Sequence, residues 1–387
     1  MSKSYIPLHA PIIKGNEFKY VNDCLKTGWV STAGKYVNLF EEKIQKYTRA
    51  KYAIACMSGT SALHISLLLS GVDSKSEVIV PTLSFIAPIN AIDYCNAKPI
   101  FMDVDDDYSL DVKKTIEFIK NNTYFKNNKT INKKTNKHIK ALIIVHVYGR
   151  SVNFEKLYLV CKKRKIKIIE DAAEGVGNFF LKGRFKKKHV GTLGDFGCLS
   201  FNGNKIITSG GGGMILTNNI SYAKKAKYLT TQSKNDGVFF VHNEIGFNYR
   251  LTNVQAAIGL AQLEKINQYI KVKKKIYSNY LSFFSKSKKL NFKKIPNFAS
   301  SNYWLNIVEF TKFSKKNDLK KIISKMNLHN IEVRPTWHLN HMQKQFNKSE
   351  TYKIENANRL ANKIICLPSS VNLSKKDIKR ICSIIDG

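Results

Sequence analysis

The stretch from residue 200 to residue 219 reads SFNGNKIITSGGGGMILTNN. Its only charged residue is Lys205, in a chain that contains 64 lysines and arginines. Four glycines follow at 210–213, and the apolar runs on either side, GCLSF and GMILT, predict buried strands. A lone lysine that follows a buried strand and precedes a glycine run indicates a functional site.

The spacing around Lys205 excludes two phosphate-binding motifs. A P-loop has its glycines before the lysine and Ser or Thr directly after it, whereas here the glycines follow and Ile206 comes next. The dinucleotide motif GxGxxG is missing too, because the first predicted strand is followed by CMSGTSALHIS at 56–66. The remaining function for Lys205 is to form a Schiff base, since burial lowers the pKa of an amine and leaves it nucleophilic.

Apolar runs and helical patterns alternate around this stretch, from about residue 52 to residue 217. Strands buried on both faces and joined by helices predict an α/β fold with a mainly parallel central sheet flanked by helices. The predicted strands are 52–56, 77–81, 98–104, 141–148, 166–173, 197–201 and 213–217.

The alternation stops near residue 250, and this change predicts the domain organisation. We expect a large cofactor-binding domain over 1–250, a long connecting helix over 251–289 and a smaller C-terminal α/β domain over 290–387. The polar, low-complexity stretch 118–140 predicts a surface loop within the large domain.

Composition limits the possible partners. The formal net charge is +36, which on its own suggests nucleic acid, but the excess lysine is scattered through the chain and favours a compositional bias. No apolar run reaches the roughly 20 residues of a membrane span, and the N-terminus lacks the apolar segment of a signal peptide. We expect a cytoplasmic protein that binds neither nucleic acid nor membrane, and no metal site from its seven cysteines.

Pyridoxal phosphate (PLP) requires a phosphate site, a carboxylate beside its pyridine nitrogen and an apolar ring contact. GTSAL at 59–63 begins a predicted helix and supplies backbone N–H groups and hydroxyls for a phosphate. Asp171 ends a predicted strand, Phe85 begins a predicted helix just after another strand, and Ser200 lies five positions before Lys205. Each has a structural alternative, as a helix start, an N-cap or a core residue. Together, at successive strand ends, they predict a PLP site.

The same motifs resemble the DegT/DnrJ/EryC1/StrS aminotransferases, the nucleotide-sugar branch of the fold-type-I PLP-dependent transferases. The resemblance covers nearly the whole chain outside 118–140. Its most specific stretches are GWVSTAGKYVNLFEEKI (28–44), GTSALHISLLLSGV (59–72), IIEDAAEGVG (168–177), the stretch around Lys205, and EIGFNYRLTNVQAAIGLAQL (244–263).

The resemblance implies a role for each site residue. Lys205 forms the Schiff base and moves the proton, Asp171 pairs with the pyridine nitrogen, and Thr60 and Ser200 bind the phosphate. Asn248 reaches that phosphate from the neighbouring subunit, so the active sites are shared in a homodimer. The predicted cofactor-binding set is Gly59, Thr60, Ser61, Phe85, Asp171, Glu174, Ser200, Asn202, Lys205 and Asn248.

The substrate is predicted from finer features. Many family members carry Gln at Glu174 and an acidic residue at Gly211, and the combination here resembles the subgroup that aminates 4-keto-6-deoxy-N-acetylhexosamines toward bacillosamine or legionaminic acid. The prediction is amino transfer from an amino acid, L-glutamate, to C4 of a nucleotide-linked sugar. Another nucleotide keto-sugar, aminated at C3 or of the perosamine type, and a basic nucleic-acid-binding protein remain alternatives. Lys35, Arg250, Arg334, Trp337 and His338 are candidates for the nucleotide diphosphate, with solvation or burial as the structural alternative.

Overall fold

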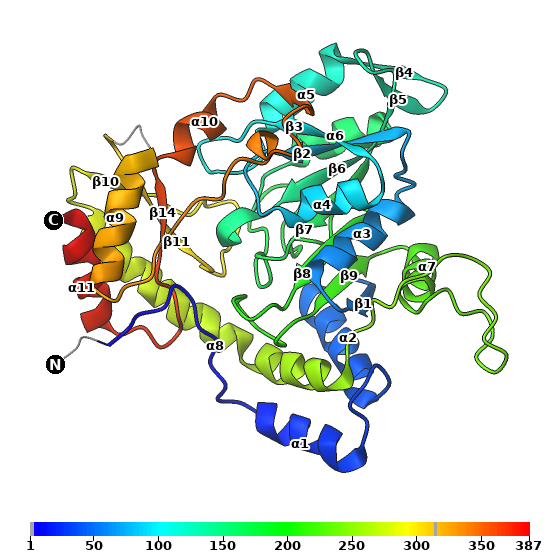
Figure 1. Ribbon diagram of the computed structural model, residues 1–387, viewed down its shortest axis with the longest axis horizontal. Coiled ribbons are helices and arrows are strands. Elements are labelled where there is room, and N and C mark those ends of the chain that lie inside the picture. Colours follow the sequence, from blue (N-terminus) through cyan, green and yellow to red (C-terminus); the bar gives the residue numbers. More distant parts are fainter. Residues whose placement is uncertain (1–3, 313–315) are drawn as a thin grey trace.

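The computed structural model describes residues 4–312 and 316–387, and it contains the predicted α/β fold (Figure 1). A ten-stranded sheet has the path β1-β9-β8-β7-β6-β2-β3-β13, with the pair β5 and β4 attached beside β6. Strands β8, β7, β6, β2, β3 and β13 run parallel, whereas β9 is antiparallel to both of its neighbours. The strands are β1 (Tyr52–Cys56), β2 (Ser76–Pro81), β3 (Lys98–Met102), β4 (Thr123–Lys126), β5 (Lys129–Asn132), β6 (His138–Val145), β7 (Lys167–Asp171), β8 (Phe196–Ser200), β9 (Gly213–Thr217) and β13 (Glu350–Tyr352).

Helices cover both faces of this sheet, because successive strand residues point to opposite sides and are apolar on both sides. In β7, Ile168 packs into the core that contains α2, α5, α6 and α8, and Ile169 packs into the core that contains α3, α4 and α7. Strands buried in this way carry near-continuous apolar runs. The helices are α1 (Glu17–Thr27), α2 (Lys35–Thr48), α3 (Gly59–Leu69), α4 (Ala87–Tyr94), α5 (Val112–Asn121), α6 (Glu155–Lys163), α7 (Ile220–Thr230) and α8 (Asn253–Phe284).

The 32-residue helix α8 links the central sheet to a second, four-stranded antiparallel sheet. Thr252 begins α8 with a capping box in which the Gln255 side chain reaches back. Its first half packs against α1 and α2, and its last turns pack with the small sheet, α9 and α11 in a separate core. The elements of this unit are β10 (Leu290–Phe292), β11 (Asn306–Phe310), α9 (Lys316–Leu328), β12 (Arg334–Pro335), β14 (Ile364–Leu367) and α11 (Lys375–Asp386), with α10 (Asn356–Ala361) beside them.

The prediction of a surface loop over 118–140 is wrong. The stretch contains the end of α5, the hairpin β4–β5 and the first strand residues of β6. Asn127 and Asn128 adopt positive φ angles of 50° and 58° and form the two-residue turn that asparagine favours in hairpins. Asn132 is buried and donates to the carboxylates of Glu77 and Glu350, so this polar segment is fixed to the sheet edge.

Two segments cross the predicted domain limits. Strand β13, from the predicted small domain, pairs with β3 of the central sheet. At the other end of the chain, Ile6 bridges to Ile331 and packs in the core of the small unit. A division at residues 250 and 290 therefore does not separate two independent packing units. Segments that are far apart in the sequence therefore pair with one another where the large domain and the small unit pack together.

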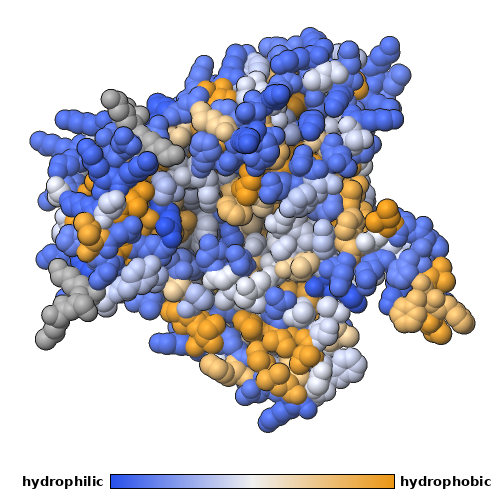
Figure 2. All heavy atoms as spheres, in the orientation of Figure 1, coloured by the Kyte–Doolittle hydropathy of each residue, from blue (hydrophilic) through white to orange (hydrophobic). Residues whose placement is uncertain are grey.

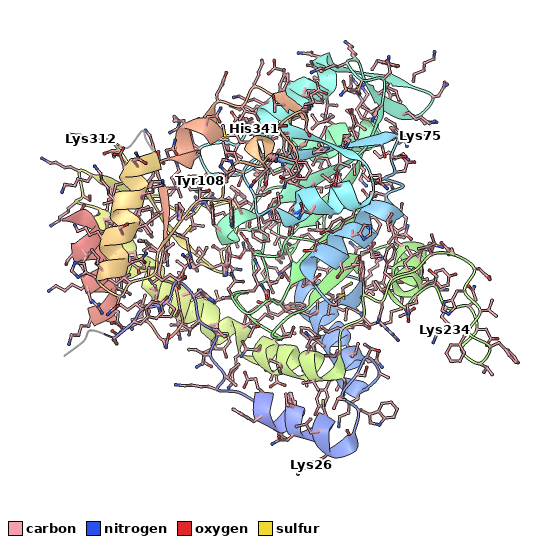
Figure 3. All side chains as sticks on the ribbon, viewed as in Figure 1. Lys26, Lys75, Tyr108, Lys234, Lys312 and His341 are labelled. Atoms are coloured by element: carbon pink, nitrogen blue, oxygen red, sulfur yellow. The ribbon has the colours of Figure 1, made fainter. Side chains whose placement is uncertain are left out.

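The positive charge is spread over the molecule. Figure 3 shows Lys26, Lys75, Lys234 and Lys312 at separate places on the periphery, on or beside different elements. Among the described residues, no helix is both long and apolar enough to cross a membrane. All seven cysteines are buried and none forms a disulfide. The part of the chain that the structure describes holds no cluster of candidate metal ligands.

Candidate active site

A cavity of about 820 Å³ opens at the carboxyl edge of the central sheet, facing the small unit. Ligands of open α/β sheets bind at this edge, where loops leave the parallel strands. From the large sheet come the ends of β6, β7 and β8 and the start of α3, and from the small unit come 304–305, 332 and 334–337. The predicted residues that line the cavity are Gly59, Thr60, Phe85, Asp171, Glu174, Ser200, Asn202, Lys205, Arg334 and Trp337.

Lys205 lies in the turn that follows β8, with its side chain 13% exposed. Its Nζ lies 3.3 Å from Oε1 of Glu174 and 4.4 Å from the ring centroid of Trp304. The Trp304 indole N–H in turn donates to the carbonyl of Asn204 at 2.7 Å. The amine is therefore held between a carboxylate and an aromatic face instead of extending into water.

The glycine run after Lys205 allows β9 to approach α3 closely. Gly212 has φ of +135°, and a Cβ on Gly213 would lie 2.3 Å from the backbone of Ser58. Only glycine fits so close to another backbone. The run therefore brings the lysine turn and the N-terminus of α3 to one side of the cavity.

Asp171 ends β7 in the cavity wall and is buried. Its Oδ1 accepts a hydrogen bond from the amide of Ala173 at 3.1 Å. Burial raises the pKa of this carboxyl, while the Ala173 amide and the charges of Lys205 and His146 oppose the rise. A positively charged ring nitrogen beside Asp171 would favour its ionised form.

The start of α3 forms an anion-binding corner. Ser58 caps the helix, and a Cβ on Gly59 would lie 2.9 Å from the Cβ of Ser200. The end of β8 therefore approaches the helix N-terminus, where backbone N–H groups attract an anion. Thr60 and Ser200 line this corner. Ser61 is not among the lining residues. Its Oγ accepts a hydrogen bond from the amide of Ser58, which completes the capping box, and its hydroxyl donates to the carbonyl of Ser58.

Aromatic side chains form the opposite wall. Trp337 stacks on Tyr148 with ring centroids 4.7 Å apart and planes 2° apart, and the edge of Phe85 approaches Trp337 at 6.4 Å. Tyr148 is fixed by its hydroxyl, 2.6 Å from Oγ1 of Thr336. Phe85 was predicted to begin a helix, but α4 begins at Ala87. The Phe85 ring is 54% exposed, as a stacking residue for a planar ligand requires.

Glu174 connects the two walls. Its Oε2 accepts a hydrogen bond of 2.6 Å from the amide of Tyr148, and its Oε1 faces Lys205. Burial raises the pKa of this carboxyl, and the charge of Lys205 opposes the rise. Asn202 lines the cavity with an exposed side chain, and its carbonyl accepts from the amide of Lys205.

Besides Ser61, four predicted residues do not line this cavity within the described chain: Lys35, Asn248, Arg250 and His338. Lys35 is exposed and pairs with Asp23 at 2.8 Å. His338 is exposed beside Trp337. Asn248 is exposed and accepts from the Arg250 side chain at 3.1 Å. Arg334 does reach the cavity, where it pairs with Glu332.

The lining residues that sequence reasoning missed include Ser58, Tyr148, Trp304 and His9. Ser58 directly precedes GTSAL, so the N-cap preference for serine was an available signal. Tyr148 ends a predicted strand but takes a positive φ of 58°. No local signal identifies Trp304 or His9, because both reach the cavity through long-range packing.

The site residues fit PLP by the chemistry of their side chains. The α3 corner suits the phosphate, Asp171 suits the pyridine nitrogen, and Lys205 suits the aldehyde carbon. Gly59, where a side chain would collide with β8, keeps the phosphate corner open to backbone N–H groups. Fold and site together define a PLP-dependent aminotransferase of the α/β class.

Comparison with known proteins identifies the family. The chain matches the DegT/DnrJ/EryC1/StrS aminotransferase family over residues 11–386 and belongs to it. It is 35% identical to the GDP-perosamine synthase of Vibrio cholerae over 98% of both chains. It is 32% identical to the putative PLP-dependent aminotransferase EpsN of Bacillus subtilis, over 98% of this chain and 95% of EpsN.

A solved structure shares the fold. Helicobacter pylori PseC, an aminotransferase of pseudaminic acid biosynthesis, superposes with a TM-score of 0.86 at 22% identity, over 99% of this chain and 98% of PseC. The predictions of the family, the α/β fold and a PLP-dependent aminotransferase are confirmed.

Proposed function

We propose that this enzyme transfers the amino group of an amino acid, L-glutamate, to C4 of a nucleotide-linked 4-keto-6-deoxy sugar for a bacterial surface glycan. The observation that carries the proposal is the position of Lys205 and Asp171 in one cavity that also has an aromatic wall. Its volume of about 820 Å³ is in the range that holds a cofactor and a bound sugar. The relatives named for nucleotide-sugar products support the substrate class.

The bound cofactor supplies an electron sink for the carbon that loses or gains the amino group. Lys205 exchanges a proton at Nζ with that carbon, and Glu174 holds the amine in reach at 3.3 Å. Asp171 keeps the ring nitrogen protonated from its place at the end of β7. Trp304 covers the amine and limits the access of water.

Two classes of sugar substrate are candidates within this proposal. The sequence motifs favour a 4-keto-6-deoxy-N-acetylhexosamine, and a relative from Campylobacter jejuni, 28% identical over 90% of this chain and 89% of its own, is named a UDP-4-amino-4,6-dideoxy-N-acetyl-β-L-altrosamine transaminase. The 35% identity to the V. cholerae GDP-perosamine synthase favours a GDP-linked sugar without the acetamido group.

A panel experiment tests the function. The PLP-loaded protein is incubated with L-glutamate and, separately, UDP- and GDP-linked 4-keto-6-deoxy sugars with and without an acetamido group, and product mass is measured. We expect one sugar class to gain an amino group, and Lys205→Ala to form no product. A wild-type protein that accepts glutamate but aminates no nucleotide keto-sugar would contradict the proposal.

We also propose a homodimer in which Asn248 completes the neighbouring site. The loop after α7 exposes Val238, Phe239 and Ile245 at 77%, 80% and 85%, and Figure 2 shows apolar side chains at the tip of this projection. An exposed apolar cluster on a projecting loop is typical of an interface. Asn248 follows the loop and does not line the cavity of its own subunit. If Asn248 contacts a cofactor phosphate, that phosphate is therefore bound in the partner subunit.

Subunit mixing tests the shared site. Lys205→Ala and Asn248→Asp are each expected to be inactive, the second because a carboxylate would face a phosphate. In a mixed dimer, one site has both its own Lys205 and its partner's native residue at 248, so random exchange should restore about a quarter of the wild-type activity. Exchange is verified by mass-tagged subunits. Verified exchange with no recovered activity would contradict the shared site.

A further inference from the structure

The N-terminal segment passes between the two sheets and carries His9 into the cavity wall (Figure 1). Residues on both sides of His9 are held by the small unit. The amide of Ser369 donates to the carbonyl of Leu8 at 2.7 Å, and the amide of Ala10 donates to Oγ of Ser370 at 2.9 Å. The segment is therefore fixed, and its histidine is presented to the cavity.

Both ring nitrogens of His9 are buried and have no hydrogen-bond partner among the described residues. The other buried imidazoles among the described residues have partners: His64 bonds the Tyr249 hydroxyl, His146 bonds Glu170, and His189 accepts from the amide of Gly177. A buried polar group without a partner costs free energy, so such groups in native proteins usually await a ligand or water. Its position in the wall of the candidate active site favours a ligand.

The chemistry of the ring selects the kind of ligand. Burial and the positive charges of Lys273 and Lys205 lower the pKa of His9 well below its ordinary value. A neutral imidazole has one donor and one acceptor, which matches a hydroxyl group, itself both donor and acceptor. A phosphate or a carboxylate would instead be bound by a cation. His9 and Lys205 line the same cavity, so a ligand held by His9 lies in the cavity that contains the reacting lysine.

On the basis of the proposed function, we propose that His9 is a specificity-determining residue that hydrogen-bonds a sugar hydroxyl of the nucleotide keto-sugar beside Lys205. The donor amino acid does not use this contact. His9 therefore acts in the half-reaction that aminates the sugar and not in the half-reaction that consumes glutamate.

The experiment separates the two half-reactions by single-turnover absorbance. The PLP-loaded protein is used for the glutamate half-reaction, and the aminated protein that glutamate produces, freed of glutamate, is used for the sugar half-reaction. The probes are L-glutamate and the nucleotide 4-keto-6-deoxy sugar that the panel experiment selects. His9→Phe keeps a ring but removes both hydrogen-bonding atoms, and His9→Gln restores one donor and one acceptor. His329→Phe, an exposed histidine outside the cavity, is the matched control.

We expect His9→Phe to lower kcat/KM for the keto-sugar by about tenfold or more, chiefly through KM, because the lost hydrogen bond leaves the hydroxyl unpaired. The glutamate half-reaction stays within about twofold of the wild type, His9→Gln recovers part of the loss, and the control changes neither half-reaction. An equal loss in both half-reactions, or no loss in an active enzyme, overturns the role of His9. A wild type that aminates no nucleotide keto-sugar overturns the proposed function, and the role of His9 with it.

Discussion

The cavity has a floor and a roof that come from different parts of the chain. The floor consists of 58–60, Asp171, Ser200 and Lys205, all at the carboxyl edge of the central sheet. The roof consists of 8–9, 304–305, 332 and 334–337, from the N-terminal segment and the small unit. Floor residues lie at or within a few residues of the ends of buried strands, whereas roof residues are placed by contacts such as the bridge from Ile6 to Ile331.

The difference in origin between floor and roof corresponds to a difference in role: the floor residues hold the cofactor and carry out the reaction, and the roof residues select the sugar substrate. The floor has the charges and helix N-terminus that a cofactor requires, and the rigid sheet holds them in place. The roof presents aromatic faces and the unpaired His9 ring to whatever lies above the cofactor. Floor variants should therefore impair both half-reactions. Variants of the roof residues His9 and Trp337 should impair only the sugar half-reaction, whereas Trp304 contacts Lys205 and should affect both.

Lys205→Ala is expected to have the largest effect. Removal of the amine takes away both the covalent attachment point and the proton carrier, so turnover should fall by roughly a thousandfold or more. Cofactor should remain bound through the α3 corner and Asp171. Product formation followed by mass measures the loss, and Lys126→Ala, on the exposed hairpin, serves as control. Turnover near the wild-type value would show that another group does this chemistry.

Asp171→Asn should lower the rate by about a hundredfold, because a neutral amide cannot stabilise a protonated ring nitrogen. Asparagine keeps an oxygen for the Ala173 amide, so the fold and the cofactor should be retained. The rates of both half-reactions measure the effect, with Asp106→Asn on the surface as control. A loss confined to the sugar half-reaction would contradict the assignment of Asp171 to the floor.

The floor was largely predictable from sequence, and the roof was not. Asp171, Ser200 and Lys205 come directly after apolar runs, and a parallel sheet brings such strand ends together. His9 and Trp304 carry no comparable signal, because their positions depend on pairings between residues hundreds of positions apart. The sheet was predictable for the same reason as the floor, except for its edge strand β13 and its β4–β5 hairpin. The hairpin lies in the stretch that was predicted to be a loop. There, polar buried residues such as Asn132 concealed the strands.

Trp337→Ala tests the roof with a smaller expected effect. Loss of the indole that stacks on Tyr148 should raise KM for the nucleotide keto-sugar by about tenfold, in the range of an aromatic contact plus its burial. The glutamate half-reaction should stay unchanged. Phe283→Ala, on α8 away from the cavity, controls for loss of an aromatic side chain. A change in the glutamate half-reaction would place Trp337 with the floor.

The smallest expected effect concerns stability, and it comes from the floor. Burial raises the pKa of Asp171 above 3.8 in the folded protein, so the folded state binds this proton more tightly than the unfolded state does. The associated stability is present below pH 3.8 and is lost as the pH rises through the folded pKa. Asparagine carries no charge at any pH, so Asp171→Asn should avoid this loss.

In cofactor-free protein, Asp171→Asn should therefore melt a few degrees above the wild type at neutral pH, with the difference shrinking toward acidic pH. Thermal unfolding over a pH series measures it. With cofactor bound, the sign should reverse, because the protonated ring nitrogen then pairs with the carboxylate and stabilises only the wild type. If the variant melts below the wild type in both states, Lys205 and the Ala173 amide already outweigh the cost of burial. The carboxylate would then be a structural residue of the floor before any cofactor arrives.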